Sequence, residues 1–249
     1  ENVLATIYGN GDLEFTGSGN TMNFANGDTP WADEDYSYVI FKDEVSPTNV
    51  DYWFEGNSDL TGCETLPKSI ESARGTFEDC ENLVKTPSFF QCSSLKIISE
   101  CFSGCTNLES SDPLPVNIME ADYAYQDCQK MVNAPDMTKT NALSSINGIF
   151  KGCTSLVAAP AIPQSVLEMS EAFSGDSNIY TASAFPESVE DISSAYMDCI
   201  SLEKAASIPV SVIDCSSCYA GCSNLNGELS INTNTESCDN LLHNAATSG

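Results

Sequence analysis

Four cysteines near the end of the chain have the spacing of a metal site. Cys215, Cys218, Cys222 and Cys238 read C-x2-C-x3-C-x15-C. A structural Zn²⁺ ion takes four such ligands in a tetrahedron, with Zn–S distances of about 2.3 Å. Each of these cysteines, however, also falls at a position that recurs along the chain, and packing of a small apolar side chain explains it. We therefore expect no metal ligand and no cofactor.

Hydrolytic chemistry has two sets of candidates. A nucleophile needs a neighbouring base, but the single histidine, His243, lies in an irregular C-terminal stretch where a surface position is expected. Asp112 and Asp136 could lie on adjacent turns of the chain, as paired catalytic carboxylates would. With 36 acidic residues such pairs also arise by chance. We expect no catalytic residue, and a carbohydrate-active solenoid enzyme that uses paired carboxylates is the alternative.

The string from Trp31 to Tyr36, WADEDY, is the most unusual local motif. Its three acids could bind Ca²⁺ through oxygen, but the ordered spacing and the glycine of an EF-hand are missing. Residues 1–53 contain ten acids against one base, Lys42. The exposed end of a stack of repeats needs such a polar surface. We interpret the string as a solvated cap loop in which Trp31 covers the first turn of the chain.

The overall charge excludes several partners. The chain has 36 acidic and nine basic residues, a net charge of −27. This field repels phosphate groups, so neither nucleic acid nor direct membrane insertion is expected, and the repulsion favours a monomer. No run approaches the roughly 18–20 apolar residues of a membrane-spanning helix. The chain opens at Glu1 without a leader, so either a leader was removed or the sequence begins downstream of one, and we expect the native chain to continue past Gly249.

A repeated element must position all of these residues. The string aromatic-x-x-Cys-x-x-Leu recurs with steps of 23, 25, 23, 25, 23, 23 and 23 residues. Its eight phased copies begin at Phe54, Phe77, Phe102, Tyr125, Phe150, Phe173, Tyr196 and Tyr219. Asn57 and Asp176 replace the cysteine in two of them. Each copy is too short to enclose a core, so its apolar positions are buried only when the next copy stacks on it.

The positions within a repeat predict its local structure. The stretch from the Leu-type residue to the next proline, such as Leu156 to Pro163, is predicted as a short strand, because proline cannot continue a ladder. The aromatic and cysteine segment is predicted to form a helical or 3₁₀ turn on the opposite side. Gly or Asp always precedes the cysteine position, which predicts a tight turn with positive φ. These positions are Gly56, Asp79, Gly104, Asp127, Gly152, Gly175, Asp198 and Gly221.

The six cysteines of the repeat should form a buried column. Adjacent members should lie about 5 Å apart, near the spacing of strands. Parallel sulfurs would have to rotate towards one another to form a disulfide, so mostly free thiols are expected. These cysteines are Cys80, Cys105, Cys128, Cys153, Cys199 and Cys222.

Together these patterns predict a β-rich α/β solenoid. It would be a right-handed superhelix of about eight units of 23–25 residues, with a parallel sheet on one face and short helical or 3₁₀ turns opposite. Residues 1–53 are predicted to form an N-terminal β-rich cap. Residues 54–249 are predicted to form the solenoid, which ends in a degenerate repeat that reads as truncated.

The repeat resembles the BspA-like leucine-rich repeats of bacterial surface proteins, whose units read roughly L-x-x-(I/A)-x-x-(I/L)-P-x-S-V-x-x-(I/M)-x-x-A-F-x-G-C-(S/T)-x. Residues 151–175, KGCTSLVAAPAIPQSVLEMSEAFSG, carry the likeness, which extends from residue 54 to about residue 245. The resemblance implies a leucine-rich-repeat fold, an extracellular or cell-surface location, and adhesion or protein binding in anaerobic, host-associated microbes. It brings no catalytic motif.

The outward residues of the predicted strands are the candidate binding residues. We expect them to recognise a protein or a glycan on host or neighbouring cells, and a structural spacer of a larger surface protein is a further alternative. The nominated residues are Glu109, Asp112, Asn133, Asp136, Tyr180, Glu203, Lys204 and Asn226.

Overall fold

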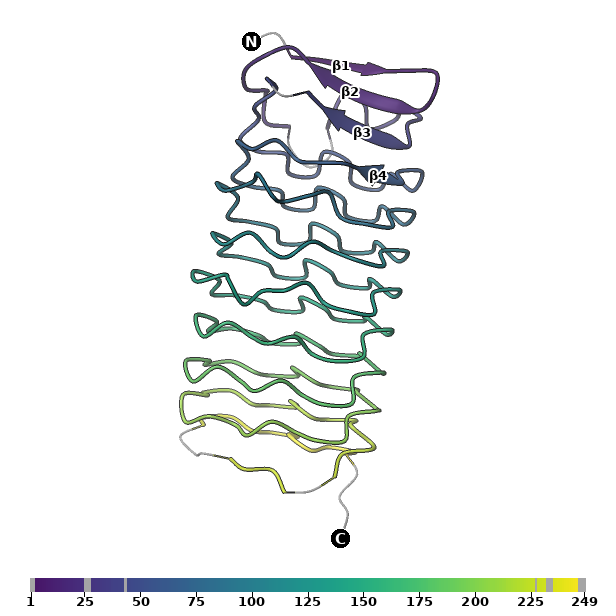
Figure 1. Ribbon diagram of the computed structural model, residues 1–249. Coiled ribbons are helices and arrows are strands. Elements are labelled where there is room, and N and C mark those ends of the chain that lie inside the picture. Colours follow the sequence, from purple (N-terminus) through teal and green to yellow (C-terminus); the bar gives the residue numbers. More distant parts are fainter. Residues whose placement is uncertain (1–2, 25–27, 43, 227, 232–234, 246–249) are drawn as a thin grey trace.

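Successive turns of the chain stack on one another from the N-terminal to the C-terminal end (Figure 1). The computed structural model describes residues 3–24, 28–42, 44–226, 228–231 and 235–245. Buried apolar side chains form one continuous cluster that runs from Leu13 to Leu241. This core follows the axis of the stack, as expected when each short repeat is buried only by its neighbours.

A four-stranded sheet lies at the N-terminal end of the stack. It contains β1 (Leu4–Ile7), β2 (Asp12–Thr16), β3 (Tyr38–Phe41) and β4 (Gly62–Cys63), in that order. β1 pairs antiparallel with β2, and the other pairs are parallel. Leu13, Val39 and Cys63 are in register and buried, so one face of this sheet continues into the core of the stack.

Trp31 covers the first turn of the chain, as the cap interpretation expects. Its indole Nε1 donates a hydrogen bond to the main-chain oxygen of Trp53 at 2.8 Å. The ring centroid of Trp31 lies 4.9 Å from that of Phe15 and 5.2 Å from that of Trp53. The three acids that follow Trp31 are exposed. The boundary of the cap at residue 53 stays a prediction.

The aromatic residues of the repeat form one stacked file through the core, as their period predicts. Adjacent ring centroids from Phe54 to Tyr219 lie 5.0–5.8 Å apart, with interplanar angles of 2–30°. Every ring of this aromatic file is almost completely buried. Large buried rings contribute much of the apolar area of a core, so the file is a main source of cohesion between turns.

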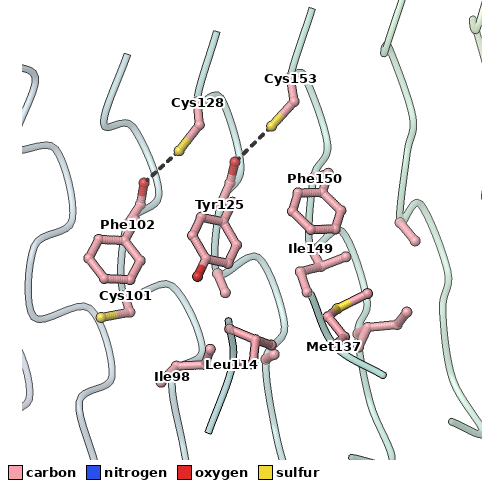
Figure 2. Packing of buried hydrophobic residues seen from close by; sticks show 14 of the residues in the cluster. Ile98, Cys101, Phe102, Leu114, Tyr125, Cys128, Met137, Ile149, Phe150 and Cys153 are labelled. Carbon is pink, nitrogen blue, oxygen red and sulfur yellow. Dashed lines mark hydrogen bonds between the residues drawn. The ribbon is translucent and has the colours of Figure 1, made fainter. Parts of the chain in front are cut away.

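A second file consists of the six repeat cysteines. Each thiol is buried and donates to the main-chain oxygen of an aromatic residue in the preceding turn, with Sγ–O distances of 3.0–3.2 Å. Figure 2 shows the bonds from Cys128 to Phe102 and from Cys153 to Tyr125. This thiol file confirms the predicted buried column. It also has a specific role, because each thiol adds a hydrogen bond between two turns to a carbonyl that already accepts an N–H within its own turn.

The predicted helical turns are wrong: the described residues contain no α-helix and no 3₁₀-helix, and so none that could span a membrane. The aromatic segment consists of consecutive turns instead. The N–H groups of Glu100, Phe102 and Gly104 donate to carbonyls of the next turn of the chain. The N–H groups of Cys101 and Cys105 close short turns onto carbonyls three residues back. In an α-helix each N–H donates to the carbonyl four residues back. Here every second N–H donates to the neighbouring turn of the stack instead, so no helix forms.

The prediction of a strand in every repeat is also wrong. Bridges on the predicted strands occur at Thr65–Ser88, Lys85–Ser110, Thr181–Lys204 and Ile208–Ile231. The segments that follow Met131 and Leu156 have no such bridge, because Pro135 and Pro160 remove the N–H donor four residues after the Leu-type residue. A continuous parallel ladder lies instead five residues before the aromatic file. It connects Asn49, Ser72, Ile97, Glu120, Ser145, Glu168, Asp191, Asp214 and Ser237 in order.

The prediction of tight turns with positive φ is confirmed. The eight Gly or Asp positions have φ between 56° and 81°. Sterics also explain the alternation, because a Cβ on Gly104 would lie 2.0 Å from Oδ1 of Asp79 in the preceding turn. The same relationship holds for Gly152 with Asp127 and for Gly221 with Asp198. A glycine therefore follows each of these aspartates along the stack.

Candidate binding surface

An exposed row runs along one side of the stack. We define it as the residue that follows each Leu-type core residue. Its members are Thr61, Val84, Glu109, Val132, Val157, Tyr180, Glu203 and Asn226, and all of them are exposed. The preceding residue in each turn, such as Leu108 or Leu202, is fully buried. Because successive side chains of extended backbone point to opposite sides, burial of the leucine fixes the outward direction of the row.

Main-chain hydrogen bonds hold parts of the exposed row together. The N–H of Glu203 donates to the oxygen of Tyr180 at 3.0 Å, and that of Asn226 donates to Glu203 at 2.9 Å. The N–H of Glu109 donates to the oxygen of Val84 at 2.9 Å. The row is thus a fixed surface on which side chains from successive turns lie next to one another.

The structure places most of the nominated residues at the surface. Seven are exposed and Asp112 is half-buried; the exposed ones are Glu109, Asn133, Asp136, Tyr180, Glu203, Lys204 and Asn226. Tyr180 has 54% of its surface exposed. Glu203 lies beside Tyr180 in the next turn, and the bridge between Thr181 and Lys204 places Lys204 beside the residue that follows Tyr180. Tyr180, Glu203, Lys204 and Asn226 therefore form one group, and their role in binding stays a prediction.

Asp112 and Asp136 each have a separate partner. Oδ1 of Asp112 lies 3.5 Å from Nζ of Lys85. Oδ1 of Asp136 accepts hydrogen bonds from the hydroxyl and the N–H of Thr138 at 2.7 and 2.8 Å. These two bonds lower the pKa of Asp136. A general acid needs a pKa raised towards the working pH, so the environment of Asp136 favours a structural carboxylate that closes its own loop.

An acidic cluster on the aromatic-segment side was missed by the sequence analysis. It comprises Tyr52, Glu55, Glu78 and Glu100, which come from three successive turns. Burial raises the pKa of Glu78 to about 7, and the charges of Glu100 and Glu55 add to this effect. Burial also raises the pKa of Glu55. The hydroxyl of Tyr52 donates to Oε2 of Glu100 at 3.2 Å. The available signal was the shared column of Glu55 and Glu78, one residue after the aromatic file.

The cysteine constellation has no free set of four thiols. A disulfide joins Cys215 to Cys238, whose Cα atoms are 4.7 Å apart. Cys218 and Cys222 are buried free thiols, and burial raises the pKa of both. Thiolates are the form that binds zinc, so this environment favours packing over ligation. His243 is exposed, as expected for a surface residue.

Comparisons with known proteins give likenesses of structure alone. No protein-family model and no curated protein matches the sequence. A leucine-rich repeat protein from Bacteroides ovatus is similar, with a TM-score of 0.54 and 20% identity over 93% of this chain and 66% of that chain. This chain therefore spans just under two thirds of the Bacteroides ovatus protein.

Two further solved structures are more distantly similar. One is the T. pallidum leucine-rich repeat protein, with a TM-score of 0.45 and 15% identity over 90% of this chain and 88% of that chain. The other is a leucine-rich cell surface protein from Faecalibacterium prausnitzii, with a TM-score of 0.30 and 14% identity over 94% of each chain. Of these three, the Bacteroides ovatus structure alone exceeds a TM-score of 0.5, and it shows that this protein has a leucine-rich-repeat fold.

Proposed function

We propose that this protein is a non-enzymatic binding module of the BspA-like type, exposed outside the cell, that recognises a protein or a glycan on host or neighbouring cells. In this proposal the chain forms about eight units in a right-handed superhelix, preceded by the N-terminal cap. The protein acts as a monomer, since its net charge of −27 opposes close approach of a second copy.

The observation that supports this function is that buried and exposed residues of each turn have separate roles. The aromatic and thiol files use the recurring residues for cohesion, and the exposed row presents residues that differ from turn to turn. A surface whose cohesion does not depend on its outward side chains can vary them to fit a partner. The group around Tyr180 offers an aromatic ring beside a carboxylate and an ammonium group, a mixture that suits protein or glycan contacts.

The test is binding of the purified protein to a glycan array and to a panel of host extracellular-matrix proteins. A variant that reverses two charges, Asp112→Lys with Asp136→Lys, should weaken binding to any partner found by about tenfold or more. The matched control reverses two exposed or half-exposed carboxylates of the parallel ladder, Glu168→Lys with Asp191→Lys, and should leave affinity nearly unchanged. Equal losses of affinity in both variants would show that the change in net charge causes the effect. They would reject Asp112 and Asp136 as residues of the binding surface.

An enzyme remains the second candidate because one observation favours it: the raised pKa of Glu78 in a cluster with two other glutamates. A carboxyl group with a pKa of about 7 can donate a proton near neutral pH. The enzyme would cleave a polysaccharide, and Glu78→Gln would abolish that activity. Release of reducing ends from a panel of polysaccharides by the wild-type protein, lost in Glu78→Gln, would favour this candidate over the binding module. Absence of both binding and cleavage would favour a structural spacer.

A further inference from the structure

Phe90 is an aromatic side chain held outside the stack. It belongs to the first 25-residue repeat, and 99% of its surface is exposed. Its neighbour Phe89 is buried and packs edge-on against Phe102, with ring centroids 6.1 Å apart. Exposure of a whole phenyl ring is unfavourable in water, and at 99% exposure the ring of Phe90 buries almost no surface that would stabilise the fold. The extra residues of a repeat map to loops that often lie on the binding face.

The loop that carries Phe90 is fixed on both sides. The N–H of Phe90 donates to the hydroxyl of Ser88 at 3.4 Å. The amide of Gln91 donates to the main-chain oxygen of Leu66 at 3.3 Å. Cys92 is buried, and its N–H bonds to the oxygen of Phe89 at 2.9 Å. The main chain on both sides of Phe90 is therefore fixed, so little main-chain freedom remains for a partner to restrict.

A pocket of about 300 Å³ lies beside the ring. Its walls include Phe89, Phe90, Pro113, Leu114, Pro115 and Val116, from two adjacent turns. Val116 is itself 47% exposed. The surface thus offers a projecting ring and, next to it, an apolar hollow large enough to admit a side chain.

This surface is uncharged within a strongly acidic molecule. Residues 88–94, SFFQCSS, and residues 113–118, PLPVNI, contain no charged residue, whereas the whole chain has a net charge of −27. Exposed acidic residues lie on the neighbouring turns: the main-chain oxygen of Glu64 accepts the N–H of Ser88, and that of Asp136 accepts the N–H of Leu114. Asp112 at the pocket pairs with Lys85, and Lys96 beyond the first loop pairs with Glu71. Apolar residues at the centre with charged groups at the rim are typical of a protein interface.

We infer that Phe90 and the adjoining pocket form a docking site for a protein partner that presents an aromatic or aliphatic side chain flanked by lysine or arginine. The apolar side chain fills the pocket against Phe90, and the basic residues meet the acidic rim. A glycan fits less well because the pocket walls offer few polar groups. A second copy is disfavoured by its own charge of −27. The inference rests on the proposed binding function and names a site and a partner chemistry for it.

The test is selection of peptides from a random phage-displayed library on the intact immobilised protein. The expected peptides contain an aromatic or large aliphatic residue with lysine or arginine close to it. Their affinity should fall by about tenfold or more on Phe90→Ser. It should be unchanged on Val210→Ser, an exposed apolar control elsewhere in the stack. Because Phe90 makes no buried contact to lose, its variant should keep the wild-type melting temperature.

The outcomes separate this inference from the general binding function. Peptides that bind Phe90→Ser as tightly as wild type overturn the inference, and if Tyr180→Ala abolishes their binding the proposed function survives at the exposed row. Selected peptides without basic residues overturn the partner chemistry. Light scattering that finds a dimer in wild type and a monomer in Phe90→Ser overturns it in favour of a second copy. A glycan bound by wild type and lost in Phe90→Ser overturns it in favour of a sugar ligand.

Discussion

The thiol of Cys128 donates a hydrogen bond to the main-chain oxygen of Phe102 across 3.2 Å, although 26 residues separate them. The same oxygen accepts the N–H of Cys105 within its own turn at 3.1 Å. One carbonyl therefore closes a turn and joins it to the next. Burial raises the pKa of the Cys128 thiol well above its ordinary value, so the group stays a neutral donor. The relationship recurs along the thiol file.

Removal of one thiol should weaken the stack. We expect Cys128→Ala to lower the free energy of unfolding by about 1–3 kcal/mol, since it leaves a small void and removes one of the two hydrogen bonds to the oxygen of Phe102. Urea denaturation followed by circular dichroism measures this difference. Ser223→Ala, at an exposed position after another repeat cysteine, is the control and should change little. If the Cys128 variant is as stable as the control, the thiol bond has no part in cohesion.

Asp176 occupies the thiol file in place of a cysteine, and its stability effect should depend on pH. It is completely buried, and among the described residues its two carboxyl oxygens have no hydrogen-bond partner. Burial raises the pKa of Asp176 well above its ordinary value of about 3.8. The folded state thus prefers the protonated acid. The wild type should be most stable below that ordinary pKa and lose stability as the pH rises towards the raised one.

The variant Asp176→Cys tests this directly. It should be more stable than wild type by about 1–3 kcal/mol at pH 8, and the gain should shrink as the pH falls below about 3, where the aspartate is protonated in both the folded and the unfolded state. Asp59→Asn, at an exposed position, should show no such trend. A gain that is the same at both pH values would show that ionisation of Asp176 is not the cause.

The sequence predicted what depends on a strict period and missed what depends on backbone hydrogen bonds. The aromatic and thiol files were predictable because Phe102, Cys105 and their equivalents keep both type and phase. The helical turns were wrong because stacking takes every second N–H, a competition that residue types do not display. The parallel ladder was missed because its members share no residue type: Ile97, for example, is paired with Glu120.

The candidate site was predictable in part for the same reason. Burial of the leucine column fixes which neighbours face outward, so the exposure of Tyr180 and Glu203 was predicted from phase alone. The acidic cluster was not, because Glu55, Glu78 and Glu100 come from different columns and turns, and only the three-dimensional stack brings them together. Phe90 was hidden by the insertion, since its extra residues have no equivalent in the 23-residue repeats.

Substitution of Gly104 should reveal the contact with Asp79. Gly104→Ala places a Cβ 2.0 Å from Oδ1 of Asp79 at a φ of 73°, and we expect a loss of about 2–3 kcal/mol in the free energy of unfolding. Gly56→Ala is a matched control with the same φ and nothing within 4 Å of the added Cβ. It should lose about 1 kcal/mol, the conformational part alone. Adding Asp79→Gly to Gly104→Ala should recover the stability lost beyond that of Gly56→Ala. Equal losses of stability in Gly104→Ala and Gly56→Ala would exclude the contact with Asp79.

The thiol count should separate the one disulfide from the free cysteines. Of twelve cysteines, ten are free and Cys215 is joined to Cys238. Titration with Ellman's reagent in denaturant should give ten thiols without reductant and twelve after reduction. Hydrogen–deuterium exchange of residues 235–245 should speed up in the Cys215→Ser, Cys238→Ser variant, because the bond ties this turn to the preceding one. Twelve thiols before reduction would contradict the pairing.

A crystal structure of the chain tests the stacked architecture most directly, through the positions of four sulfur atoms. We predict that Sγ of Cys80, Cys105, Cys128 and Cys153 lie in one interior file, each 3.0–3.2 Å from the main-chain oxygen of an aromatic residue in the preceding turn. The rings of Phe102, Tyr125 and Phe150 should stack beside them. Sulfurs scattered over different faces, or rings that point to solvent, would contradict the account.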